Sequence, residues 1–241
     1  MQRLLKLDVN MVIFVEPKGR PFIDWMRRGR ENRTYMMDIS LETLPYYRFR
    51  DQFLSIMSSE DYKRDNELVS TGKAEALFPE YDILQLSKFY FMDRAVQENI
   101  FNNSYFVWLD AGYGHGADVY PKNGVWLPKN LFDHADQLTF IEREPGADYY
   151  EPVKHRLHKM SINIIAGLFF GGGRNVMREA YRLQQKELDR WLKQGIVDDD
   201  QTMYMLLYYR YPTMFHLVRG DWSDVFNLFN APQSTSMSHN L

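Results

Sequence analysis

Short apolar runs that alternate with stretches of helical periodicity are the feature of this sequence that most restricts its fold. Runs of about five to nine apolar residues are typical of buried strands and are too short to span a membrane. The sequence predicts strands over residues 9–15, 33–39, 105–109, 137–142, 162–170 and 213–218, and helices over residues 22–30, 46–64, 83–99, 174–194 and 201–210. Because strands alternate with helices, the sequence predicts a layered α/β fold.

Charge and cysteine content exclude several classes of function. The chain has 29 Lys and Arg against 32 Asp and Glu, so it lacks the basic excess of a nucleic-acid-binding protein. It has no cysteine, which excludes disulfides, thiolate metal sites and thiol nucleophiles and favours a reducing compartment. No apolar run approaches the length of about 18 residues that a membrane span needs, so we expect a cytoplasmic protein without a transmembrane segment.

A cluster of arginines near the N-terminus permits two interpretations. Residues 22–30, FIDWMRRGR, contain Arg27, Arg28 and Arg30. They form either a solvated helix face or a patch that binds phosphate or lipid headgroups. The second interpretation predicts peripheral attachment to the inner membrane face through residues 25–30.

The segment YFVWLDAGYGHG, residues 105–116, carries the strongest local signal for a binding site. Its strand delivers Asp110 to the carboxyl end, and a glycine-rich loop follows. Ligands of open α/β sheets bind at that end, and a carboxylate there suits a divalent cation that bridges the phosphates of a nucleotide. Alternatively, Asp110 bonds its own backbone in a turn. Tyr113 and Trp222 adjoin loop glycines and are candidates for stacking on a base or sugar ring.

Three further segments carry candidate site residues. Ala166 and Gly167 interrupt a predicted strand, which marks the close approach of a ligand or another segment, or else a bulge. In the run from Asp198 to Asp200, either one aspartate caps the next helix and two are solvated, or one of the last two is a general base. His216 lies in an apolar strand as a core histidine, a metal ligand or a phosphate donor.

Together these segments resemble one protein family. They are PEYDILQLSK (79–88), FVWLDAGYGHG (106–116), IAGLFFGGGRNV (165–176), DDDQTMYMLLYYRYPTMFHL (198–217) and GDW (220–222). In this order they are similar to the HtrL/YibB-like family, within the GT-A-type nucleotide-sugar transferases. The resemblance implies a GT-A-like, Rossmann-type sheet that is mixed, mostly parallel and flanked by helices. We expect a single domain over residues 1–230 and a disordered, Ser-rich tail over residues 231–241.

The resemblance also implies roles for individual residues. Asp110 and His216 would bind Mn²⁺ or Mg²⁺, and Asp200, or failing that Asp199, would be the general base near the reacting carbon. The substrate-binding residues that it implies are Lys88, Arg94, Asp110, Ala111, Gly112, Ala166, Gly167, Gln201 and Trp222.

Two departures from the family pattern affect these expectations. Gly112 replaces the second carboxylate of the Asp-x-Asp motif, so either His115 or Asp118 substitutes for it or the metal is bound weakly. Relatives are expected to begin with an extra strand that carries a nucleotide-contacting loop. This chain opens at residues 1–10, MQRLLKLDVN, which are similar to the segment after that strand. We therefore expect the chain to lack the family's first strand.

The leading hypothesis for function is a glycosyltransferase. It would move a sugar from a nucleoside-diphosphate sugar to a hydroxyl of a glycan, a lipid-linked molecule or a protein, in surface polysaccharide or glycan synthesis. One alternative is a catalytically silent binding module with the same fold. Another is a metal-dependent phosphoester hydrolase that uses Asp110 and residues 198–200. The sequence leaves open the donor, the acceptor, the stereochemical course and the oligomeric state.

Overall fold

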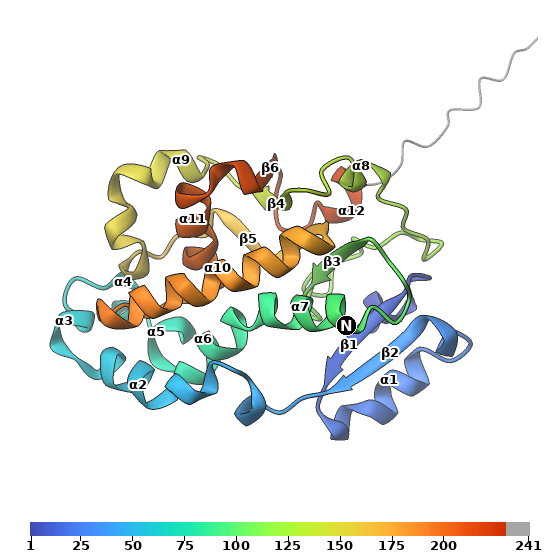
Figure 1. Cartoon of the computed structure of the whole chain (residues 1–241), viewed down its shortest axis with the longest axis horizontal. Helices are drawn as coiled ribbons and strands as arrows, with labels where there is room; N and C mark the ends of the chain where they lie inside the picture. Colours follow the sequence, from blue (N-terminus) through green and yellow to red (C-terminus); the bar gives the residue numbers. More distant parts are fainter. Residues whose placement is uncertain (230–241) are drawn as a thin grey trace, which may run out of the picture.

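The structure is a computed structural model that describes residues 1–229 (Figure 1). The strands in this part of the chain are β1 (Met11–Val15), β2 (Thr34–Asp38), β3 (Tyr105–Leu109), β4 (Leu138–Glu142), β5 (Ile165–Gly173) and β6 (Phe215–Arg219). Its α-helices are α1 (Arg20–Met26), α2 (Arg50–Ser58), α3 (Glu60–Lys63), α4 (Glu67–Ser70), α5 (Ala74–Leu77), α6 (Pro79–Leu86), α7 (Lys88–Glu98), α8 (Lys129–Phe132), α9 (Ala147–Tyr150), α10 (Arg174–Lys193), α11 (Asp200–Arg210) and α12 (Val225–Leu228). Short 3-10 helices lie at Leu4–Lys6, Pro17–Gly19, Glu31–Arg33, Leu41–Thr43, Tyr47–Phe49, Glu151–Lys159 and Pro212–Met214.

The strands form two separate sheets. β1 and β2 pair in parallel, and the other four strands form a sheet in the order β3-β5-β4-β6. β5 runs antiparallel to both of its neighbours, whereas β4 and β6 are parallel. The protein is therefore mixed α/β with a mixed sheet, as predicted, but β5 is antiparallel to both of its neighbours, so the sheet is not a clear Rossmann sheet. The physical reason lies in the connection after β4. The backbone N of Arg143 donates to the carbonyl of Ile164, so β5 starts where β4 ends and must run back along it.

Helices and loops cover both faces of the four-stranded sheet around β5. Successive side chains of a strand point to opposite faces, and Phe169 and Phe170 of β5 are both fully buried. Phe170 packs in the larger core with α7 and α10, which lie side by side in Figure 1. Phe169 packs in a second core with residues of α12. Burial on both faces explains why the sequence of this strand is apolar without alternation.

The glycines at the end of β5 differ from the prediction. We expected the strand to end before Gly171, but it continues through Gly173. A Cβ atom at Gly173 would lie only 2.7 Å from the carbonyl oxygen of Ala135. These glycines therefore belong to the strand because neighbouring segments approach its backbone closely.

The helix predicted over residues 83–99 is divided into α6 and α7. The division falls at Ser87, whose hydroxyl donates to the carbonyl of Ile83 at 2.7 Å. Such a bond offers the backbone an alternative to the regular helical ladder. The break gives α7 its own first residue, Lys88, which is important for the site described below.

The arginine cluster near the N-terminus is partly structural. Arg27 is 1% exposed, and its guanidinium donates to the carbonyls of Leu5, Leu7 and Val9. Burial is the main reason that its pKa is lowered to about 10. Arg27 therefore belongs neither to a solvated helix face nor to a ligand patch, whereas Arg28 is exposed.

Two predictions concern the chain as a whole. The expected disordered tail, residues 231–241, lies outside the described residues. Within residues 1–229, no helix combines the length and the apolar character that crossing a membrane requires.

Candidate functional site

The side chain of Lys88 lies where several of the segments singled out above meet. Its Nζ atom lies 2.8 Å from Oδ2 of Asp200 and 3.3 Å from Oδ2 of Asp110. It also donates to the carbonyl of Gly167 at 2.9 Å. We call Lys88, Asp110, Gly167 and Asp200 the Lys88 cluster. All four were candidate site residues in the sequence, and the structure brings them together from α7, β3, β5 and α11.

Asp110 is fixed at the carboxyl end of β3. Its backbone N donates to the carbonyl of Leu168 at 2.9 Å, which continues the ladder between β3 and β5. The indole Nε1 of Trp108 donates to its Oδ1 at 2.6 Å, while its Oδ2 faces Lys88. The side chain of Asp110 is 30% exposed, against 7% for Lys88 and 3% for Asp200. The Lys88 cluster therefore reaches solvent through the carboxylate of Asp110.

Gly167 is a glycine because Asp200 lies against it. A Cβ atom built on Gly167 would lie 2.7 Å from Oδ2 of Asp200. Any larger residue would therefore displace the carboxylate that pairs with Lys88. The close approach that a strand glycine indicates here comes from a side chain of the protein itself.

The charges of the Lys88 cluster compensate one another in part. Burial alone would lower the pKa of Lys88, but the carboxylates of Asp200 and Asp110 outweigh it, so this pKa is raised. Burial raises the pKa of Asp200, and the charge of Lys88 opposes that rise. One lysine faces two carboxyl groups, and this excess of acidic groups favours a cation over a free anion at the exposed side chain of Asp110.

The aspartates before α11 are buried rather than solvated. Asp199 caps the helix, because its Oδ1 accepts from the backbone N of Gln201 at 2.9 Å, as one of the two interpretations predicted. Asp198 is 2% exposed and its Oδ1 accepts from the backbone N of Asp199. Burial, followed by the charge of Asp200, raises the pKa of Asp199 to about 7. Asp198 and Asp199 thus add two buried acidic residues directly before Asp200 of the Lys88 cluster.

A further buried carboxyl group, that of Asp82 in α6, interacts electrostatically with Asp198 and Asp199. It is fully buried, and neither of its carboxyl oxygens has a hydrogen-bond partner among residues 1–229. Burial and the charges of Asp198 and Asp199 raise its pKa well above the ordinary value. Sequence reasoning missed this residue, since a single aspartate in an amphipathic helix usually faces solvent.

Two side chains share the sheet edge of Asp110. β3, β4 and β6 run in one direction, so their carboxyl ends lie at a common edge. Arg143 follows β4 and Trp222 lies shortly after β6, and the guanidinium of Arg143 lies 5.2 Å from the centre of the Trp222 ring. Sequence reasoning proposed Trp222 and missed Arg143. Arg143 follows its strand as Asp110 follows β3, so the same strand-end argument would have identified it.

His216 is not close to Asp110. It lies near the amino end of β6, at the level of Thr139, and its ring stacks on that of His134 with centroids 3.6 Å apart. Burial and the neighbouring His134 lower its pKa. Three strand spacings separate β3 from β6, a distance of about 14 Å. The two residues that the resemblance implied as metal ligands are therefore not together.

The remaining candidates are spread around the cluster. Arg94 is partly exposed and pairs with Glu98 at 3.4 Å. Ala166 is fully buried in the second core, so its side chain cannot contact a ligand at the surface. Gly112, beside Ala111 in the loop after β3, has open space where a Cβ would lie. Tyr113, a candidate for stacking, is instead buried against the Phe226 ring.

A divalent metal would find one accessible carboxylate at this site. No group of three or more His, Asp or Glu side chains in residues 1–229 is arranged to hold a metal ion. Mg²⁺ in proteins is often held by one or two carboxylates together with substrate phosphates and water. Asp110 could supply one such carboxylate, whereas Asp199 and Asp200 are buried and do not reach the surface.

Comparison with known proteins defines the family. The model of a bacterial protein family of unknown function, HtrL_YibB, matches residues 1–231, so the chain belongs to this family. Protein HtrL of Escherichia coli strain K12 is a relative that is 26% identical over 239 residues, which cover 95% of this chain and 80% of HtrL. No solved structure matches the chain.

Proposed function

We propose that this protein is a glycosyltransferase that transfers a sugar from a nucleoside-diphosphate sugar to a hydroxyl acceptor. The observation that carries the proposal is the Lys88 cluster. Four segments with the residue types of a nucleotide-sugar site converge on it, and its one exposed carboxylate lies at a strand end. Strand carboxyl ends are where α/β sheets bind ligands. The GT-A assignment of the fold is part of the same proposal.

In this proposal Asp110 holds the diphosphate side of the donor through a divalent ion. When bound there, Mn²⁺ or Mg²⁺ would supply Lewis-acid stabilisation of the leaving diphosphate. Trp108 and Lys88 orient the carboxylate of Asp110 through contacts to its two oxygens. The open space over Gly112 leaves room for the donor beside this carboxylate.

Arg143 and Trp222 are proposed to bind the other part of the substrate. They lie on the sheet edge that also carries Asp110, two and three strands away. A guanidinium beside an indole ring offers hydrogen-bond donors to phosphate or hydroxyl oxygens and an apolar face for a sugar ring. A nucleotide sugar lying along this edge would contact both Asp110 and Trp222.

Asp200 is proposed to position Lys88 rather than to act as a base in the resting protein. A general base must come within about 3 Å of the acceptor hydroxyl. The side chain of Asp200 is 3% exposed and is occupied by Lys88, and Asp199 caps a helix. Either residue would need a local opening of the site to reach an acceptor, so the sequence-based assignment of the base stays a hypothesis.

Calorimetric titration with UDP, GDP and their sugars, with and without Mn²⁺, tests the proposal. We expect binding that requires the metal and is lost in Asp110→Asn but kept in Arg94→Gln, a partly exposed control on α7 that pairs with Glu98. Release of nucleoside diphosphate on adding an acceptor would then establish transfer. Failure of every nucleotide to bind would contradict the proposal. Binding without transfer would favour the silent module, and phosphate release from simple esters would favour a hydrolase.

A further inference from the structure

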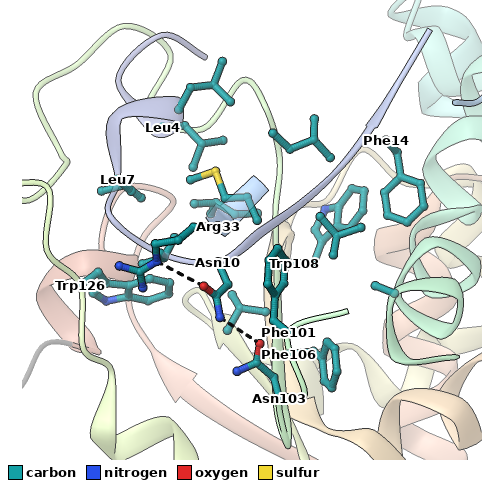
Figure 2. Close-up of a pocket in the computed structure, with 18 of the residues that line it drawn as sticks. Leu4, Leu7, Asn10, Phe14, Arg33, Phe101, Asn103, Phe106, Trp108 and Trp126 are labelled. Atoms are coloured by element: carbon teal, nitrogen blue, oxygen red, sulfur yellow. Dashed lines mark hydrogen bonds between the residues drawn. The ribbon is translucent and has the colours of Figure 1, made fainter. Parts of the chain in front are cut away.

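A large apolar groove separates the two sheets. It has a volume of about 590 Å³ and is lined by every residue of β1 and every residue of β3. Figure 2 draws part of this lining, including Phe14 of β1 and Trp108 of β3. β2 contributes none of its residues, so β1 and β3 are the strands that face each other. At one end of the groove, Arg33 donates to Asn10, which donates to Asn103.

Both walls of the groove are free strand edges. β3 is the terminal strand of the four-stranded sheet, and β1 pairs only with β2 in the part of the chain described. In an antiparallel ladder, alternate residues bond the partner strand. Asp110 N donates to β5 and Ser104 O accepts from Arg174 N, so Val107 and Leu109 direct their backbone groups away from β5. These N–H and C=O groups point into the groove.

The two remaining sides of the groove are covered by the two hydrophobic cores. Phe14 of β1 packs with Phe91 of α7 in the larger core, and Met92 of α7 lines the groove on that side. Leu7 and Trp126 belong to the second core and line the other side. A strand placed in the groove would therefore be buried on both faces, and its sequence would have to be apolar without alternation.

We propose that this groove binds one extended, apolar polypeptide strand, and that the strand comes from the part of an HtrL-like chain that these 241 residues do not match. An extended strand pairs its backbone with both edges, whereas an acyl chain would leave their N–H and C=O groups without partners. The match covers 80% of E. coli HtrL, so about a fifth of that protein lies outside it, ample for one strand. β1 and β3 each have five residues, and a strand of that length spans about 17 Å. The added strand would join the two sheets into one.

Synthetic peptides test this proposal on the intact 241-residue protein. Overlapping peptides of about 15 residues, each longer than one strand, would cover the unmatched part of E. coli HtrL. Trp108 and Trp126 line the groove and report binding through their fluorescence. We expect one peptide to bind and to slow hydrogen exchange at Val107 and Leu109. The same peptide N-methylated at alternate residues should bind about tenfold more weakly or worse, since it keeps every side chain but loses the donors to one edge.

A pair of protein variants makes the test independent of the peptide chemistry. Val107→Pro removes an N–H that faces the groove and leaves the bonds to β5 in place, whereas Val107→Ala keeps the N–H. We expect only Val107→Pro to weaken peptide binding. The proposal is overturned if no peptide binds or if the N-methylated peptide binds equally well. It is also overturned if dodecanoate occupies the groove instead, or if a second copy of the chain protects these amides in a concentration-dependent dimer.

Discussion

At the scale of single residues, the site depends on how closely Asp200 approaches Gly167. Gly167→Ala places a methyl group where only 2.7 Å separates it from Oδ2 of Asp200, so the ion pair with Lys88 has to move. We expect a loss of about 1–3 kcal/mol in the free energy of unfolding, as for other overpacked sites. Urea denaturation measures this. Gly112→Ala is the matched control, because nothing lies within 4 Å of its added Cβ. Equal stability of the two variants would contradict the packing argument.

Lys88 is the cation on which the buried carboxylate of Asp200 depends. Removing one partner of a buried ion pair typically costs about 3–5 kcal/mol, so Lys88→Met should be strongly destabilised at neutral pH. Without Lys88 the pKa of Asp200 rises further above its value in the unfolded chain. The folded variant then binds more protons than the unfolded chain, and its deficit should shrink as the pH falls from about 7.5 to about 5. Urea denaturation at both pH values measures the deficit, and a deficit independent of pH would contradict this account.

At the scale of elements, α6 and α11 meet across buried carboxyl groups. Asp82 has a pKa raised by burial and by Asp198, so its contribution to stability decreases as the pH rises above the pKa of the unfolded chain. We expect Asp82→Asn to gain stability relative to the native protein between about pH 5 and pH 8. The gain should be at most about 1.4 kcal/mol per pH unit. Denaturation curves across this range measure it, with exposed Asp51→Asn as the control. A constant difference would show that Asp82 does not titrate differently on folding.

The strands and the longer helices could be predicted from local sequence patterns, and two differences have identifiable physical causes. β3 has the bounds that the run YFVWL predicted, and α10 ends within one residue of its predicted end. The glycines after Phe170 read as a strand end because glycine is rare inside strands, yet the close approach of Ala135 requires them there. Ser87 divides a helix because its hydroxyl bonds a carbonyl one turn back, which periodicity does not reveal.

At the scale of the whole molecule, the two sheets should differ in local stability. β1 has one strand neighbour and is only half-buried, whereas β4 and β5 are buried along their whole length. Segments with fewer buried contacts open at lower free energy. We expect amide hydrogens of β1 and β2 to exchange faster than those of β4 and β5. Hydrogen exchange with mass spectrometry measures this, and uniform protection across both sheets would contradict it.

The sequence by itself determined where the six strands of the described residues and the longer helices lie, and it placed Asp110 at a strand end. Those features depend on residue periodicity within a few turns or strand lengths. The tertiary structure decided the direction of β5, the separation of His216 from Asp110 and the pairing of Lys88 with Asp200. These depend on where a connection returns and on which distant side chains meet in the interior, so no local pattern encodes them. Burial of the aspartates around Asp199 followed from the same long-range packing.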